Sequence, residues 1–105
     1  MAFVEDAENR EFDEVVSFQQ WREVLREAPM SFAVKRDYQS DIGGLLRACK
    51  AANRPISVGF IRWYLARRGL SDTERAYQRE ALKWFFQSAR KVGGVARREG
   101  RFQPP

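Results

Sequence analysis

The residues best placed to do chemistry are four cations in the segment Ser71–Lys91. On a helical wheel of about 100° per residue, these four side chains fall within roughly 80° of one another. A broad apolar arc occupies a different side of the same helix. The cations are Arg75, Arg79, Lys83 and Arg90. Glu80 is the only acid between Arg75 and Lys91. An aromatic face that anchors the helix, with a row of cations turned to solvent, suits the phosphate backbone of a nucleic acid.

The charge of the chain is unevenly distributed around its net value of +5. Residues 1–30 hold eight acids against three bases, and residues 31–105 hold six acids against sixteen bases. A domain body this basic favours polyanions as partners, although a basic surface can also serve solubility alone. The composition therefore favours nucleic acid and leaves the solubility interpretation open.

Catalytic chemistry finds little support in the residue types. The chain has no histidine, so ordinary zinc sites and histidine-based proton transfer are excluded. Its one cysteine, Cys49, lies on an apolar arc and is expected to be a buried, inert thiol. We expect no cofactor and no metal. A single cysteine and no apolar run long enough to span a bilayer favour a cytoplasmic protein with no membrane partner.

Four helical segments separated by short breaks are predicted along the chain. Serine N-caps, prolines, Asn53 and glycines mark their ends. The segments are Asp13 or Ser17 to Glu27, Phe32 to Ala52, Ser57 to Arg68, and Ser71 to Lys91. No strand-like alternation is evident, so the predicted fold is all-α: a compact four-helix domain over residues 17–92. An acidic leader (1–16) and a flexible basic linker (93–105) are expected to flank it.

The second predicted helix carries its own polar side, formed by Arg36, Gln39, Ser40, Arg47 and Lys50. Gly43 and Gly44 lie in the middle of that helix, where each costs about 1 kcal/mol relative to alanine. Close packing or a bend would explain both glycines. Alternatively, Gly43 would let a DNA backbone approach beside Arg36 and Arg47.

Four motifs occur in a recognisable order along these helices. They are FxxWxxVL in Phe18–Leu25, SxxxKxxYxxDI in Ser31–Ile42, RPISVGFIRWYL in Arg54–Leu65, and RxALKWFFxxAR in Arg79–Arg90. In this order the motifs resemble the N-terminal, SAM-like core-binding domain of tyrosine recombinases, the phage and integron integrases. The resemblance covers residues 17–91, and each motif by itself is degenerate.

The resemblance implies one half of a C-shaped clamp around double-stranded DNA, with the second and fourth helices directed toward the major groove. The implied DNA contacts are Lys35, Arg36 and Gln39 on the second helix and Arg75, Arg79 and Lys83 on the fourth. The predicted set is completed by three further residues of the same two helices, Arg47, Gln78 and Arg90. Gln39, Gln78 and Arg79 are candidates for base edges. The family's catalysis lies in a C-terminal domain, so this chain is expected to be non-catalytic. It would be a fragment of a longer integrase, the interpretation we favour, or a stand-alone remnant. Its implied partners are DNA, that catalytic domain and other recombinase protomers.

Two other functions remain open. A helix-turn-helix regulator would use a short turn such as Arg68-Gly69-Leu70-Ser71 before a recognition helix. A protein-interaction domain would use exposed aromatics such as Trp63, which falls toward the polar side of the third helix.

Overall fold

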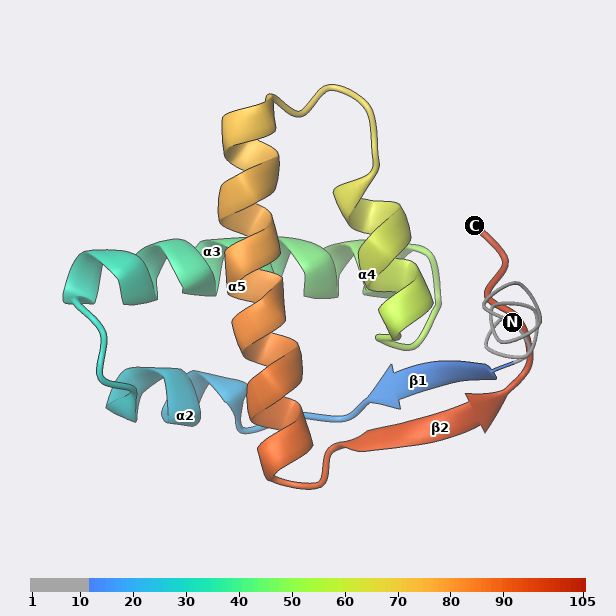
Figure 1. Cartoon of the computed structure of the whole chain (residues 1–105), viewed down its shortest axis with the longest axis horizontal. Helices are drawn as coiled ribbons and strands as arrows, with labels where there is room; N and C mark the ends of the chain where they lie inside the picture. The colour runs from blue at the N-terminus through green and yellow to red at the C-terminus, as the bar shows by residue number, and fades with distance from the viewer. Residues whose placement is uncertain (1–11) are drawn as a thin grey trace, which may run out of the picture.

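Four helices and one two-stranded antiparallel sheet form residues 12–105, which are the residues that the computed structural model describes (Figure 1). None of the helices in this part of the chain is long and apolar enough to cross a membrane. The elements in chain order are β1 (Phe12–Val16), α2 (Trp21–Glu27), α3 (Phe32–Ala51), α4 (Val58–Leu65), α5 (Asp72–Lys91) and β2 (Val95–Glu99).

The predicted helices are confirmed at most of their ends. Ser31, Ser57 and Ser71 each accept a hydrogen bond from the backbone N–H three residues on, at 3.2, 3.0 and 3.1 Å, as N-caps do. Asn53 takes the left-handed conformation (φ 54°) after α3, as the helix stop requires. The first helix is shorter than predicted, however, because it begins at Trp21, and α4 ends at Leu65 rather than Arg68.

The all-α prediction is wrong, because the two flanks of the helical domain pair as strands. In the register, Asp13 lies opposite Arg98 and Glu14 opposite Arg97. Such cross-strand pairs of opposite charge stabilise an antiparallel ladder. Val16 is buried at the helical end of β1, so the sheet is also attached to the core.

The basic tail is not the flexible linker that was predicted. Beyond β2, the ring of Phe102 packs edge-on against Phe60, with 6.3 Å between centroids. Arg54 donates a hydrogen bond of 2.7 Å to the carbonyl of Gln103. Gly59 lies beneath Phe102, where an added Cβ would come within 2.5 Å of that side chain. Residues 1–11 of the predicted acidic leader lie outside the described residues.

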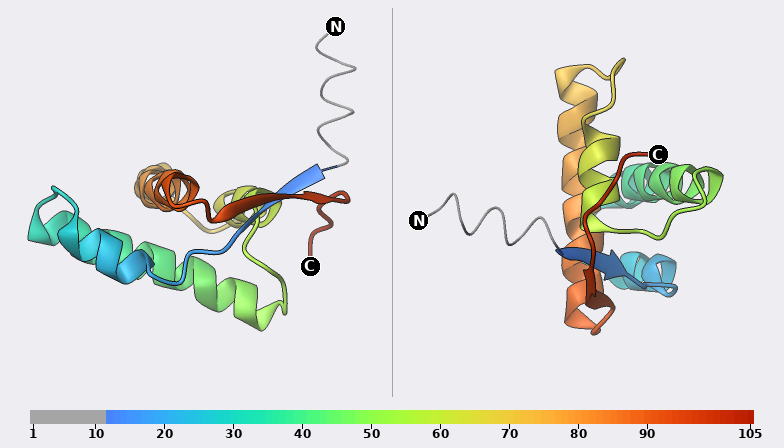
Figure 2. Two further views of the ribbon diagram at one scale, coloured as in Figure 1. Left: turned by 90° about the horizontal axis from the view of Figure 1, so that it is seen from below. Right: turned by 90° about the vertical axis from the view of Figure 1, so that its right-hand side faces the viewer.

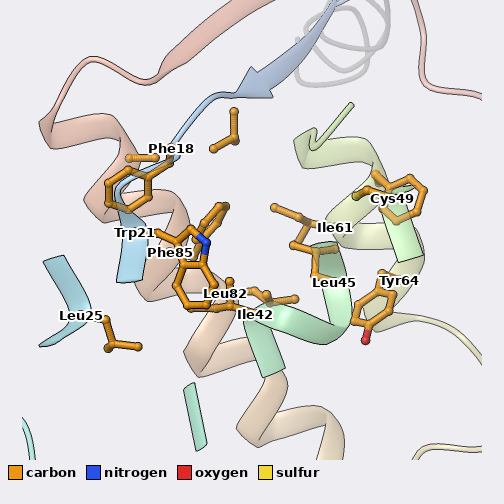
Figure 3. Close-up of a cluster of buried hydrophobic side chains, with 13 residues drawn as sticks. Phe18, Trp21, Leu25, Ile42, Leu45, Cys49, Ile61, Tyr64, Leu82 and Phe85 are labelled. Carbon is orange, nitrogen blue, oxygen red and sulfur yellow. The ribbon is translucent and has the colours of Figure 1, made fainter. Parts of the chain in front are cut away.

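The core lies between two layers that Figure 2 shows most clearly: α4, α5 and the sheet form one layer, and α2 and α3 form the other. Phe85 of α5 packs against Phe18 and Trp21, with ring centroids 5.5 and 6.4 Å apart (Figure 3). Ile42 and Leu45 of α3 complete this centre and are fully buried. This packing fixes which side of each long helix faces solvent.

The two glycines in α3 have different surroundings. A Cβ on Gly44 would come within 2.8 Å of the Tyr64 hydroxyl, so this glycine permits close packing of α4 on α3. A Cβ on Gly43 would instead lie 3.3 Å from the guanidinium of Arg47. The packing explanation therefore accounts for Gly44, and the DNA approach over Gly43 stays a prediction.

Candidate nucleic-acid interface

Three of the four cations in the α5 row are presented to solvent. Arg79, Lys83 and Arg90 are exposed, and the structure gives them no ion pair with any residue of the described range 12–105. The Arg90 guanidinium lies 5.8 Å from the ring centroid of Phe86, one turn before it on α5. These side chains are available to an anionic partner along one side of the helix.

Arg75, the first member of the row, is occupied within the protein. Its Nε donates to the carbonyl of Leu65 at 2.8 Å, and a terminal nitrogen donates to the carbonyl of Arg67 at 3.3 Å. Asp72 lies 3.5 Å away as an ion-pair partner. Arg75 therefore ties the C-terminal end of α4 to α5, a position where cations stabilise the last helical carbonyls.

Gln78, predicted to contact a base edge, is only partly exposed. Its amide oxygen is buried and has no hydrogen-bond partner within residues 12–105. That oxygen points into the protein and is not presented to a DNA groove.

The predicted contacts on α3 also divide into free and occupied residues. Arg36, Gln39 and Arg47 are exposed. Lys35 is not free, because its Nζ donates to the carbonyl of Arg26 in the last turn of α2. We call Arg36, Arg47 and Lys50, the exposed cations on this side of α3, the α3 row.

The structure does not bring the α3 row and the α5 row to one face. The helices pack on each other through Tyr38 and Trp84, whose ring centroids are 6.2 Å apart. On α3, Arg36 and Arg47 lie roughly 160–180° around the helix from Tyr38, and on α5 Arg79 lies roughly 140° from Trp84, at about 100° per residue. Because α3 and α5 lie in different layers (Figure 2), the two rows face opposite sides of the molecule.

The α5 row instead continues into a hollow between α4, α5 and the sheet. The hollow has a volume of about 1060 Å³. Four arginines from different elements line it: Arg62 of α4, Arg90 of α5, Arg97 of β2, and Arg101 just after β2. Phe12 and Phe102 form part of its wall, and the Arg97 guanidinium lies 4.5 Å from the Phe12 ring centroid.

The two acids beside the hollow do not cancel this charge. The Asp13 carboxylate accepts hydrogen bonds from the backbone N–H of Gly59 at 3.0 Å and of Glu14 at 2.9 Å. Glu14 is left opposite Arg97 in the ladder. With four arginines against two acids, one of them already hydrogen-bonded to backbone, the hollow favours an anion.

Arg90 belongs both to the α5 row and to the hollow, so the two form one continuous basic surface. We call it the α5–sheet surface, made of Arg62, Arg79, Lys83, Arg90, Arg97 and Arg101. Sequence reasoning identified Arg79, Lys83 and Arg90 and missed the other three. The sequence held a signal for Arg97 and Arg101, because the acids Asp13-Glu14 and the bases Arg97-Arg98 are complementary partners for two strands. Arg62 lies on α4 and joins them through tertiary packing.

The described residues contain no group of three histidine, cysteine, aspartate or glutamate side chains placed to hold a metal ion. Cys49 is buried, and burial raises the pKa of its thiol to about 11. At neutral pH the thiol is therefore protonated and a poor nucleophile.

No family model, curated protein or solved structure matches this chain. The similarity to recombinase core-binding domains therefore depends on the four sequence motifs alone.

Proposed function

We propose that this protein binds double-stranded DNA through the α5–sheet surface. The observation that supports the proposal most directly is the convergence of cations from α4, α5, β2 and the tail on one side of the molecule. Solubility alone requires no such convergence, since dispersed charges serve it equally well.

The dimensions and charge of this surface suit a duplex. Arg79 and Arg90 are separated by roughly 16 Å along α5, at 1.5 Å per residue, and the hollow extends the surface further. Six cations that each neutralise one phosphate would make the affinity fall about a thousandfold between 50 and 200 mM salt. Most of these contacts position the protein, and Arg79 is the candidate for reading a guanine edge.

We further propose that this binding serves a site-specific tyrosine recombinase. The support is the order of the four motifs, and the fold correction above leaves the helical part of that pattern in place. In this role the chain positions the recombinase on a half-site in the cytoplasm, without catalysing the reaction itself. Its partners would be the catalytic domain and neighbouring protomers.

Two matched triple variants test DNA binding. The first reverses the three solvent-presented cations of the α5 row (Arg79→Glu, Lys83→Glu, Arg90→Glu), and the second reverses the α3 row (Arg36→Glu, Arg47→Glu, Lys50→Glu). Both change the net charge equally, so a difference between them reports on position. We expect the α5 variant to lose at least about a hundredfold in duplex affinity by fluorescence anisotropy, and the α3 variant less than about tenfold.

Circular dichroism spectra and melting curves of both variants control for folding. Equal loss of affinity in the two variants would show that DNA binding depends on net charge and not on the position of the cations. That result would contradict the proposed surface. Unchanged affinity in the α5 variant would contradict DNA binding at this site.

The number of protein copies on the DNA distinguishes the helix-turn-helix alternative from the recombinase role. A palindromic footprint with a dimer in solution would favour a regulator. A monomer that protects a single half-site would favour the recombinase module. Footprinting and sedimentation velocity on the same sample provide both observations.

A further inference from the structure

An aromatic corner of opposite charge lies outside the α5–sheet surface, where the N-terminal half of α3 meets α5. Tyr38 and Trp84 pack together at its base. Two turns before Trp84 on the same side of α5, Tyr77 is 68% exposed, and Val34, one turn before Tyr38, is 38% exposed. Apolar side chains this exposed at the junction of two packed helices are typical of an interaction surface.

Acidic side chains border this corner. Glu80 is one turn before Trp84 on the same side of α5, and the Trp84 ring packs on Tyr38. Burial, and after it the negative charge of Glu80, raises the pKa of Tyr38. On α3, Asp37 acts in the same way on Asp41, whose pKa is raised by burial first and by Asp37 second.

Arg36 and Arg79 lie roughly 160° and 140° around their helices from Tyr38 and Trp84, at about 100° per residue. Lys35 is turned to α2, where it donates to the carbonyl of Arg26. Lys83 lies about 100° from Trp84, at the outer edge of the corner.

We propose that this acidic aromatic corner, made of Val34, Asp37, Tyr38, Tyr77, Glu80 and Trp84, binds an arginine-containing segment of a partner protein. The charge of the corner is opposite to that of the DNA-binding surface, so a basic peptide is attracted to it and DNA is repelled. The inference is independent of the proposed function, because the two surfaces share no residue.

Arginine fits the corner better than lysine does. A planar guanidinium stacks on an exposed tyrosine ring and can also form paired hydrogen bonds to a carboxylate. Tyr77 and Glu80 are three residues apart on α5, so ring and carboxylate lie on neighbouring positions of one helix face. Asp37 approaches from α3, and the aliphatic part of the side chain would lie along Trp84 and Val34.

The probe is a blocked nine-residue peptide with two arginines among alanines and leucines, titrated into the full ¹⁵N-labelled chain. Versions with lysine or citrulline in place of arginine are the ligand controls. We expect amide shifts in residues 34–41 and 77–84 and a shift of the Trp84 indole. Lysine should weaken binding severalfold, and citrulline, which keeps the shape but not the charge, at least about tenfold.

Variants of exposed residues test the site without altering the core. Tyr77→Ala and Glu80→Gln should each weaken peptide binding at least about fivefold. Duplex DNA affinity should be unchanged in Tyr77→Ala and should not fall in Glu80→Gln, which removes the one acid between Arg75 and Lys91. Phe32→Ala removes a 79% exposed aromatic elsewhere on α3, and Glu23→Gln removes an exposed acid on α2. Both matched controls should bind the peptide as the unaltered chain does.

Three outcomes would overturn the proposal. One is unchanged peptide affinity in both Tyr77→Ala and Glu80→Gln, and a second is a shift pattern centred on Asp13 and Glu14. The third is movement of the same amides when the protein is diluted alone, which would assign the corner to a second copy of this chain.

Discussion

The cation rows of α5 and α3 have similar composition but different surroundings. At its C-terminal end the α5 row meets Arg62, Arg97 and Arg101, which α4, β2 and the tail bring to the same hollow. The α3 row lies in the other layer, away from the sheet. Two rows of cations can therefore differ as binding surfaces, because the neighbouring elements decide whether a row extends into a larger basic surface.

The first cation in each long helix shows a second effect of the surroundings. Lys35 is the fourth residue of α3 and donates to the last turn of α2, and Arg75 is the fourth residue of α5 and donates to the end of α4. In both helix pairs this position faces the C-terminal carbonyls of the preceding helix, where a cation is stabilising. Spacing alone cannot distinguish such a cation from a free one.

The largest expected effect comes from disrupting the connection between α5 and β2, which holds the sheet beside the α5 row. Gly94 connects α5 to β2, and an added Cβ would collide with the backbone carbonyl of Ser17. Gly94→Ala should therefore cost roughly 2–3 kcal/mol of unfolding free energy, measured by urea denaturation, because backbone must shift. Gly93→Asn is the matched control and should cost much less, since asparagine tolerates its positive φ and the space around it is open. Equal losses of unfolding free energy in the two variants would show that the close approach of Gly94 to Ser17 does not hold the sheet in place.

The next largest effect tests the hollow against the α3 row. Arg97→Ala with Arg101→Ala should lower duplex affinity about ten- to a hundredfold and reduce the salt slope, d log K/d log[salt], by roughly 2. Arg36→Ala with Arg47→Ala should leave the slope within error. Anisotropy titrations at four salt concentrations provide both slopes. The comparison fails if the α3 pair changes the slope as much as the hollow pair does.

A smaller effect separates two arginines of the same row. Arg75→Ala should lower stability by about 1–2 kcal/mol, because it removes two hydrogen bonds to helix-terminal carbonyls. Arg79→Ala should change stability by less than about 0.5 kcal/mol, as exposed substitutions usually do. In DNA binding the order should reverse, with Arg79→Ala the weaker binder. Thermal melts and anisotropy of both variants check this, and an Arg79→Ala variant that is the less stable of the two would contradict it.

The smallest effect concerns the acidic flank of α3. Burial, and after it the charge of Asp37, raises the pKa of Asp41 above its ordinary value of 3.8. The folded state therefore holds this proton more tightly, and the associated stability is lost as the pH rises through the folded-state pKa. Asp41→Asn should raise the Tm by up to a few degrees at pH 7 and show no difference below about pH 3.8. It should leave DNA affinity unchanged, although it makes α3 more positive. A gain in Tm that persists at pH 3 would exclude the ionisation explanation.

Local signals predicted the helical part of the fold. Ser31, Ser57 and Ser71 marked the helix starts, and Pro29 and Asn53 marked two stops, because capping and backbone restriction act over a few residues. The sheet escaped prediction since its strands, each of five residues, come from opposite ends of the described chain. Their stability depends on a partner that no local window contains.

The candidate site was likewise predicted only where local sequence determines it. Arg79, Lys83 and Arg90 follow from helical periodicity. Arg62, Arg97 and Arg101 lie on three other parts of the chain and converge only after β1 and β2 pair. Conversely, Arg75 and Lys35 donate to backbone carbonyls only because the end of the preceding helix lies beside each of them. Periodicity identifies a face of one helix, and only tertiary packing shows what lies next to it.

The antiparallel pairing of β1 with β2 also determines how the protein responds to mechanical force. Phe12 and Glu99 lie at the same end of the ladder, so tension applied through the two flanks separates the strands one pair at a time, from the outermost pair inward. Unzipping of this kind needs far less force than shearing strands past each other. We therefore expect a load on the flanks to dismantle the arginine hollow first, while α2, α3 and α5 remain packed around Phe85.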